Sequence, residues 1–302
     1  NAKRYHSLNY FLRNKYGEKI YKIPLDGGFT CPNRDGKVAK GGCTFCSSHG
    51  SGDFAGSRIL TITEQFDDRK KVMEKKWNKG KYIAYFQAYT NTYAPIEELR
   101  EKYSQAIAEE NVALSIATRP DCLGDDVLEL LEEMSKKVYL WVELGLQTIN
   151  DETAENFNRG YKFEVFKEGI KKLQDRGIEV VVHSIFGLPG ETKEDMLKTI
   201  DYIAHSGAQG IKFHLLHLMK YTKMAEQYYN GEFELLSEED YIDLICEGIS
   251  MIPEDMVVHR LTGDAPRATL IGPMWSLKKW EVLNAIDKAL VDRDIWQGKN
   301  FK

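Results

Sequence analysis

The chain of 302 residues has no apolar run long enough for a membrane span, no excess of basic charge and no low-complexity tract. A spanning helix needs about 18 or more consecutive apolar residues, so we expect no membrane-spanning segment. The formal net charge is −5 and the sequence pI is about 5.9. Because no global basic field surrounds the protein, a nucleic-acid partner would have to be held by a local patch.

The chain is also poor in cysteine. It has five, an odd number, and its N-terminus carries no apolar signal segment. Both features argue against a disulfide framework and favour a protein of the reducing cytoplasm. Cys122 and Cys246 fall in or beside segments with a helical pattern, and we expect them to be small buried hydrophobic residues.

The other three cysteines, Cys31, Cys43 and Cys46, lie close together in a glycine-rich stretch. A [4Fe–4S] cluster normally takes four cysteines, so three of them would leave one iron open to another ligand. His49, three residues after Cys46, offers a different possibility, a Cys₃His zinc site. A loop of thiols that binds no metal is the third. The spacing alone leaves all three open.

Strand-like and helix-like segments alternate over the first two thirds of the chain, which predicts an α/β protein with parallel strands and right-handed crossovers. Six strand–helix units are too few for a closed eight-stranded barrel, so we expect a partial (β/α)6 barrel. One helix start is marked by a capping box, Thr192 to Asp195. The expected strands are 21–25, 82–87, 113–117, 139–143, 179–185 and 210–216, and the expected helices are 62–77, 95–107, 125–136, 163–174 and 192–205.

The alternation ends near residue 220, and it predicts a division into three parts. These are an N-terminal segment (1–20), the partial barrel (21–218) and an α-rich C-terminal extension (219–302). The extension is expected to hold helices at 222–229, 237–251 and 277–290 and a short strand at 256–261. The sequence leaves open whether this extension packs on the barrel or forms a second small domain.

Four further segments stand at or near the ends of the expected strands. They are Gln87-Ala88-Tyr89-Thr90, Glu143-Leu144-Gly145-Leu146-Gln147-Thr148, Asn158-Arg159-Gly160 and His183-Ser184-Ile185-Phe186-Gly187-Leu188-Pro189-Gly190-Glu191-Thr192. With the cysteine loop, this set resembles the radical S-adenosylmethionine (SAM) enzymes, in particular the branch near the catalytic subunit of Elongator and the oxygen-independent coproporphyrinogen oxidases. The gap between the first two cysteines is longer than in the superfamily's usual CxxxCxxC motif, and lengthened gaps occur in the Elongator-like branch.

The resemblance implies two cofactors. Cys31, Cys43 and Cys46 would bind a [4Fe–4S] cluster, and the amino and carboxylate groups of SAM would chelate its open iron. One electron, from a donor such as flavodoxin or ferredoxin, would then split SAM and give a 5′-deoxyadenosyl radical that removes hydrogen from a substrate.

The resemblance also implies roles for seven residues at the strand ends. The backbone of Gln87, Ala88 and Tyr89 would meet the SAM amine. Glu143 and Gln147 belong to a segment that contacts the ribose or the methionine portion. Arg159 would pair with the SAM carboxylate, since a guanidinium is always charged and bidentate. His183 belongs to the segment that lines the ribose and adenine. Ordinary strand-end polar residues, a surface ion pair and a tight turn are the simpler alternatives.

For the substrate, the resemblance implies tRNA and the carbon-5 side chain of a wobble uridine, with no membrane partner. A radical enzyme acting on a small metabolite or porphyrin and a non-catalytic zinc module that binds RNA are the alternatives. Two groups of residues are candidates for substrate contact. The first is N-terminal, Lys3, Arg4, Arg13, Lys15, Lys19 and Lys22 interleaved with Tyr5, Tyr10, Phe11, Tyr16 and Tyr21. The second is Lys212, His214, His217, Lys220, His259, Arg260, Asp264 and Arg267. A helix packed on the barrel is the alternative for the first group, and ordinary barrel or surface residues for the second.

Overall fold

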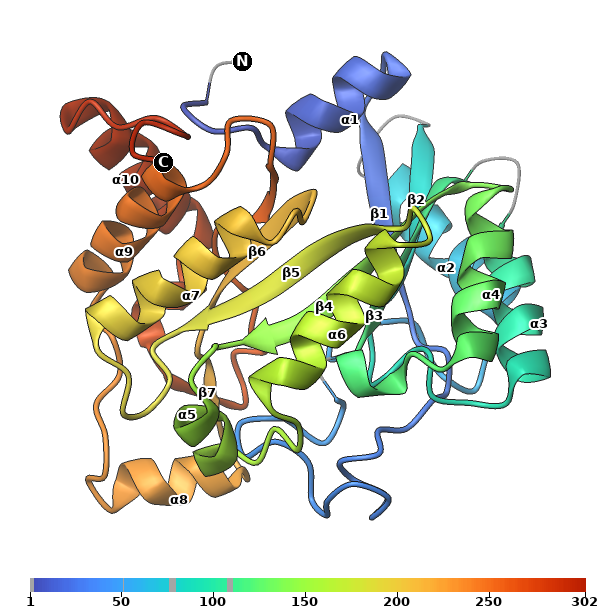
Figure 1. Cartoon of the computed structure of the whole chain (residues 1–302), viewed down its shortest axis with the longest axis horizontal. Coiled ribbons are helices and arrows are strands. Elements are labelled where there is room, and N and C mark those ends of the chain that lie inside the picture. Colours follow the sequence, from blue (N-terminus) through green and yellow to red (C-terminus); the bar gives the residue numbers. More distant parts are fainter. Residues whose placement is uncertain (1–2, 51, 76–79, 108–110) are drawn as a thin grey trace.

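The computed structural model describes residues 3–50, 52–75, 80–107 and 111–302. Seven parallel strands form one curved sheet in the order β1-β2-β3-β4-β5-β6-β8 (Figure 1). Each pair of neighbouring strands up to β6 is consecutive in the chain, as repeated strand–helix units require. The strands are β1 (Ile20–Leu25), β2 (Lys81–Phe86), β3 (Asn111–Thr118), β4 (Tyr139–Gln147), β5 (Glu179–Phe186), β6 (Gly210–Leu215) and β8 (Val257–Arg260).

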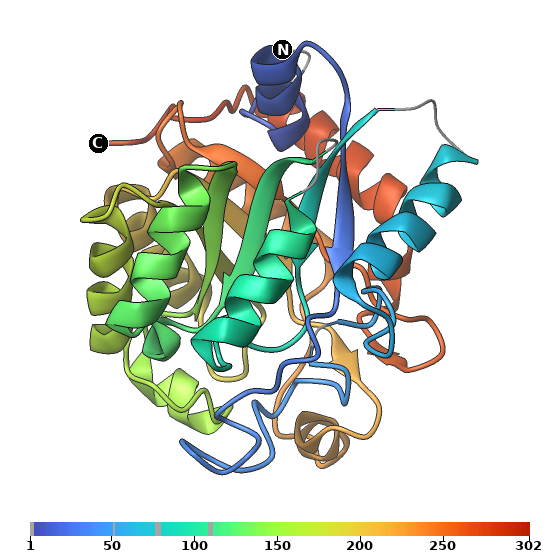
Figure 2. The same cartoon turned by 90° about the vertical axis from the view of Figure 1, so that its right-hand side faces the viewer.

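Helices cover the outer face of this sheet, as Figure 2 shows. Their buried faces carry the apolar residues that the helical period places on one side, for example Val127, Leu130, Leu131 and Met134 in α4. The helices that follow the barrel strands are α2 (Ile62–Glu74), α3 (Ile96–Ala106), α4 (Asp125–Ser135), α5 (Asp151–Asn156), α6 (Phe163–Gln174) and α7 (Lys193–His205). The expected α/β partial barrel is thereby confirmed. The end of the helix expected at 62–77 lies outside the described residues.

The C-terminal region packs on the barrel. Its strand β8 pairs in parallel with β6 and so adds a seventh strand to the sheet. Helix α9 (Glu238–Met251) lies against α7 and α10 (Lys279–Asp292). Buried residues of α9, β8 and α10 belong to the same hydrophobic core as the barrel helices. The short helix α8 (Lys223–Tyr229) and an antiparallel pair, β7 (Leu218–Met219) with β9 (Leu270–Gly272), complete this region.

Helix α1 (Leu8–Tyr16) lies at the N-terminal end of the barrel, opposite the cysteine loop (Figures 1 and 2). Its Leu12 packs with the inward-facing Ile83, Trp141 and Val181 in a hydrophobic cluster that fills this end. The proposed N-terminal basic and aromatic group therefore does not form one face. Lys22 points into the barrel interior toward Glu143, on the other side of the apolar layer from α1.

None of the helices in the described part of the chain is both long and apolar enough to cross a membrane.

Candidate active site

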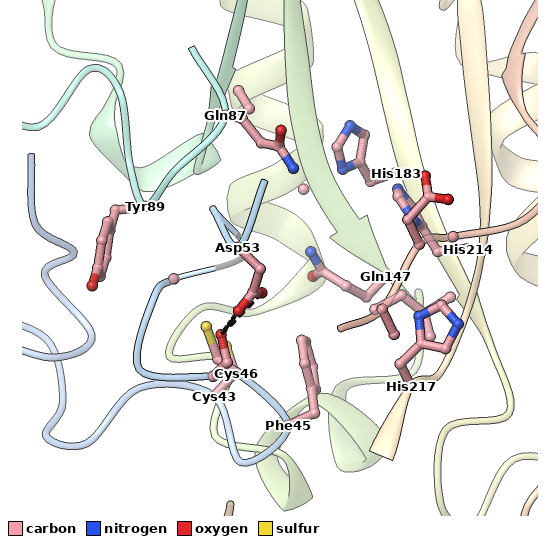
Figure 3. A pocket seen from close by; sticks show the side chains of 18 of the residues that line it. Cys43, Phe45, Cys46, Asp53, Gln87, Tyr89, Gln147, His183, His214 and His217 are labelled. Carbon is pink, nitrogen blue, oxygen red and sulfur yellow. Dashed lines mark hydrogen bonds between the residues drawn. The ribbon is translucent and has the colours of Figure 1, made fainter. Parts of the chain in front are cut away.

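A cavity of about 750 Å³ opens at the carboxyl ends of the strands, and it reaches into the barrel (Figure 3). This volume is within the range of small-molecule sites, and parallel α/β sheets bind ligands at this edge. Cys31, Cys43 and Cys46 all line it. Of the other predicted site residues, the lining includes Gln87, Tyr89, Glu143, Gln147, Arg159 and His183.

Two turns bring the cysteines of one loop to the same cavity. The Arg34 N–H donates to the carbonyl of Cys31 at 2.8 Å, and the Cys46 N–H donates to that of Cys43 at 3.0 Å. Asn33 Nδ2 lies 3.7 Å from Cys43 Sγ and donates to the Asn158 carbonyl at 2.6 Å. Burial, followed by the neighbouring Cys46, raises the pKa of the Cys43 thiol to about 12. Metal binding at this thiol would have to displace its proton, because the thiolate is the form that binds metal.

Arg34 and Tyr89 bind the backbone of this loop. The Arg34 guanidinium donates to the carbonyls of Cys46 and Ser47 and lies over the Tyr89 ring, 5.3 Å from its centroid. Tyr89 Oη donates to the Ser48 carbonyl at 2.5 Å. Tyr89 itself has φ 62°, a strained value for a residue with a side chain. Arg34 and Tyr89 thus fix the cysteine loop, and both also line the cavity.

The segment after β2 also contacts the loop through its backbone. The Tyr89 N–H donates to the Gly50 carbonyl at 2.9 Å, and the Thr90 N–H donates to that of Thr30 at 3.2 Å. Ala88 is completely buried beneath the loop and does not line the cavity. The side chain of Gln87 does line the cavity (Figure 3). Their proposed contact with the SAM amine stays a prediction.

At the end of β4, Gln147 and Arg159 play different parts. Gln147 takes φ 63° at a register shift between β4 and β5, and it lines the cavity. Arg159 is 1% exposed, and its guanidinium donates to the carbonyls of Leu146 (2.6 Å), Thr148 (2.7 Å) and Tyr161 (3.0 Å). It therefore fixes the turn that presents Gln147. Pairing of Arg159 with a SAM carboxylate stays a prediction.

Deeper in the barrel, Glu143 is the centre of a buried polar layer. Its Oε1 accepts from Ser115 at 2.9 Å and Trp141 at 3.3 Å, and its Oε2 accepts from Lys212 and lies 2.8 Å from His183 Nε2. Burial alone would raise the pKa of Glu143, but Lys212, then Lys22 and His183, hold it well below its usual range. Glu143 is therefore ionised. Burial lowers the pKa of His183, so the imidazole is neutral.

The second predicted group of substrate residues is only partly brought together. His214, His217, Arg260 and Asp264 line the cavity. Lys212 and His259 lie below it, where the Lys212 ammonium contacts Glu143 and the His259 ring lies edge-on to Trp141, 5.5 Å between centroids. Lys220 lies outside the cavity and donates to the Ala268 carbonyl at 3.0 Å.

The zinc alternative finds no support in the geometry. His49 has a side chain 72% exposed, and its Nδ1 lies 3.5 Å from Asp53. Among the described residues, no group of three His, Cys, Asp or Glu side chains is arranged around a point that one metal ion would occupy. A cubane cluster has separate iron corners, so its three cysteines need to face one cavity rather than converge on one ion. The donor set here fits a cluster better than a single zinc ion.

Two family models match the chain. The radical SAM superfamily model matches residues 31–203, and the radical SAM C-terminal domain model matches residues 208–292. The chain therefore belongs to the radical SAM superfamily.

Its relatives confirm the Elongator-like branch. YtqA of Bacillus subtilis is 55% identical over 301 residues, 99% of this chain and 94% of YtqA. A tRNA uridine(34) acetyltransferase of Methanocaldococcus jannaschii is 29% identical over 177 residues, 58% of this chain and 32% of that enzyme. The structure of Methanocaldococcus infernus Elp3 with an N-terminal deletion matches with a TM-score of 0.71 and 18% identity, over 92% of this chain and 64% of that chain. That structure supports the fold.

Several residues that shape the site are not among the predicted site residues. Tyr161 lies between the guanidinium groups of Arg119 and Arg159, 4.8 and 4.6 Å from its ring centroid, and donates to the Gly145 carbonyl at 2.6 Å. Tyr85 lines the cavity beside Lys212. Residues two apart in a strand face the same side of the sheet. Because Gln87 was predicted to lie in the cavity, Tyr85 could have been identified as facing it too.

Glu191, in the segment after β5, gives a prediction on pH. Burial raises the pKa of its carboxyl to about 7, although Thr148 donates to it. The native state therefore binds more protons than the unfolded state between about pH 4.3 and pH 7, and this group's contribution to stability falls as the pH rises through that window. Glutamine does not titrate, so Glu191→Gln removes this loss. The free energy of unfolding of the variant minus that of wild type should therefore be about 1–2 kcal/mol higher at pH 8 than at pH 5.

Urea unfolding of the ligand-free protein at both pH values measures this difference. The control is Glu194→Gln, because Glu194 is exposed in the same turn and, unlike Asp195, does not cap α7. An equal pH dependence in Glu191→Gln and wild type would contradict the prediction.

Proposed function

We propose that this protein uses radical SAM chemistry to modify the carbon-5 side chain of a wobble uridine in tRNA, by trimming or remodelling a group such as carboxymethylaminomethyl. The observation that carries the proposal is the meeting of three thiols and the strand-end segments at one cavity, in a chain that shares sequence with a tRNA uridine(34) acetyltransferase.

The parts of the site divide between cofactor and substrate. Cys31, Cys43 and Cys46 would hold the cluster, while the amide groups of Gln87 and Gln147 face the same space and can donate and accept hydrogen bonds with SAM. The chemistry that cluster-bound SAM supplies in this superfamily is the generation of a carbon radical that takes a hydrogen atom from the substrate. The protein's own residues position both molecules and exclude water from the space between them.

The depth of the polar layer in the barrel favours a substrate with a side chain that protrudes from the rest of the molecule. The polar layer at Glu143 lies four residues before the end of β4 at Gln147, about 13 Å along the strand. A side chain on a base splayed out of single-stranded RNA can reach into such a space, and unpaired loops are where proteins read RNA bases. A small metabolite or porphyrin is the competing substrate, and the acidic net charge is the observation in its favour.

Mass spectrometry of tRNA nucleosides from cells with and without this protein tests the proposal. We expect loss of one modified wobble uridine and accumulation of its precursor with an altered carbon-5 side chain. Reintroducing the wild-type gene should restore the pattern, and the Cys43→Ala gene should not. Identical nucleosides in both strains, together with SAM cleavage that tRNA does not affect, would favour the small-molecule substrate.

A further inference from the structure

The buried layer around Glu143 holds more positive than negative charge. Lys22 and Lys212 share this one carboxylate: Lys22 Nζ lies 3.5 Å from Oε1, and Lys212 contacts Oε2. The side chains of Lys212 and Glu143 are 3% and 0% exposed, and that of Lys22 is 25% exposed. Because charges buried in a protein need a partner, two ammonium groups on one carboxylate leave part of the charge uncompensated.

Arg260 adds a third cation. It lies at the end of β8, and its guanidinium is 3.6 Å from Asp264. Asp264 is itself bound by Lys279 at 2.7 Å and is 39% exposed. Glu143 and Asp264 are thus each shared by two cations. Lys22, Arg260, Asp264 and Lys279 all line the cavity.

Both lysines are close enough to Arg260 for its charge to affect them. Burial lowers the pKa of Lys22 and of Lys212; Glu143 opposes the shift, and Arg260 adds to it. An anion placed among these groups would relieve the repulsion between them.

Lys22 and Arg260 line the same cavity from the two opposite edges of the sheet. β1 and β8 are its two outermost strands, and within the described residues they do not pair with each other. The curvature of the sheet brings one cation from each edge to the same cavity. A ligand entering there would have a positive group on either side.

From this arrangement we infer that the barrel interior contains an anion-binding subsite, formed by Lys22 and Arg260 with Lys212 behind them, which takes a carboxylate of the substrate. The depth of this subsite below the strand ends favours a carboxylate over a phosphate of the nucleic-acid backbone. Lys22 lies three residues before the end of β1 at Leu25, about 10 Å below the strand ends. A phosphodiester is flanked by sugars on both sides and cannot descend that far, whereas a carboxylate at the tip of a side chain can.

The inference is tested with the SAM-bound holoenzyme and two anticodon stem-loops. One carries carboxymethylaminomethyl on its wobble uridine and the other carries aminomethyl, so they differ by one carboxylate-bearing group. We expect wild type to bind the first about tenfold more tightly, measured by fluorescence polarisation at fixed salt. Lys22→Met and Arg260→Gln should each bring the ratio close to one, and Lys22→Arg should keep it. Lys81→Met, an exposed lysine of the same sheet, is the matched control.

A second arm uses acetate and does not rest on the function proposed above. Saturation-transfer NMR should show the acetate methyl bound to wild type and to Lys81→Met, and unbound in Lys22→Met and Arg260→Gln. Acetate binding without any stem-loop binding would uphold the subsite and reject the tRNA function. The subsite is rejected if Lys22→Met and Arg260→Gln keep the tenfold preference, or if wild type binds neither acetate nor the carboxylate-bearing stem-loop. It is also rejected if Lys22→Met weakens SAM binding and leaves the stem-loop preference unchanged.

Discussion

Replacing Cys43 with alanine should abolish iron and sulfide binding and, with it, reductive cleavage of SAM. Three cysteines face the cavity, and a cluster that already lacks a fourth cysteine cannot lose another ligand without losing its attachment. The fold should survive, since the substitution removes one sulfur atom from a loop at the end of the barrel. We expect a loss of activity of at least 10³-fold, on the order expected when an essential reacting group is removed.

The measurement is made on anaerobically reconstituted protein, as iron and sulfide content, visible absorbance and 5′-deoxyadenosine formed with dithionite. Cys122→Ala is the matched control, because burial also raises the pKa of this thiol and it lies outside the cavity lining. The control should retain iron, sulfide and SAM cleavage. A Cys43→Ala protein with a full cluster would show that the ligand set is wrong.

Glu143→Gln should destabilise the fold by about 3–5 kcal/mol, the usual cost of removing one partner from a buried ion pair. Glutamine has nearly the same shape, yet it leaves the Lys22 and Lys212 ammonium groups without their shared carboxylate. The contribution of Glu143 depends on its ionised form. Because its pKa is held well below the ordinary value, this contribution is present above about pH 4.3 and is lost only as the pH falls toward the lowered pKa.

Urea unfolding at pH 7.5 measures this effect. The double variant Glu143→Leu with Lys212→Met removes both charges of the closest pair, so it should be less destabilised than Glu143→Leu alone. Ser115→Ala serves as a control that removes one hydrogen bond to Glu143 and no charge; its expected cost is about 1 kcal/mol. A cost below about 1 kcal/mol for Glu143→Gln would mean that the lysines do not depend on this carboxylate.

Much of the fold was predictable because local signals agreed with the tertiary structure. The helix expected at 163–174 has these bounds, and the capping box at Thr192 forms as expected, with Asp195 accepting from the Thr192 N–H at 2.9 Å. The strand expected at 256–261 was found at Val257–Arg260, but its place in the main sheet was not predicted. A four-residue strand carries no information about which edge it will join.

The site was predicted less completely, because side-chain direction depends on details of register. Lys22 belongs to a basic and aromatic stretch that suggested a surface, and its position in β1 turns it inward. Gln147 reaches the cavity through a register shift and a positive φ, neither of which its sequence context reveals. Arg159 lines the cavity, and its sequence context does not reveal that its guanidinium also binds three carbonyl groups.

The two outermost strands of the sheet leave a seam in the barrel, because they do not pair with each other within the described residues. Residues from the segment after β8, among them Gly263, Pro266 and Leu277, form part of the cavity wall. These three residues lie outside the seven strands and take no part in the hydrogen bonding of the main sheet. Insertions or exchanges in this part of the wall leave the hydrogen bonding of the seven strands intact. Divergence among relatives in this segment can therefore alter which molecules enter while the cofactor end of the barrel stays the same.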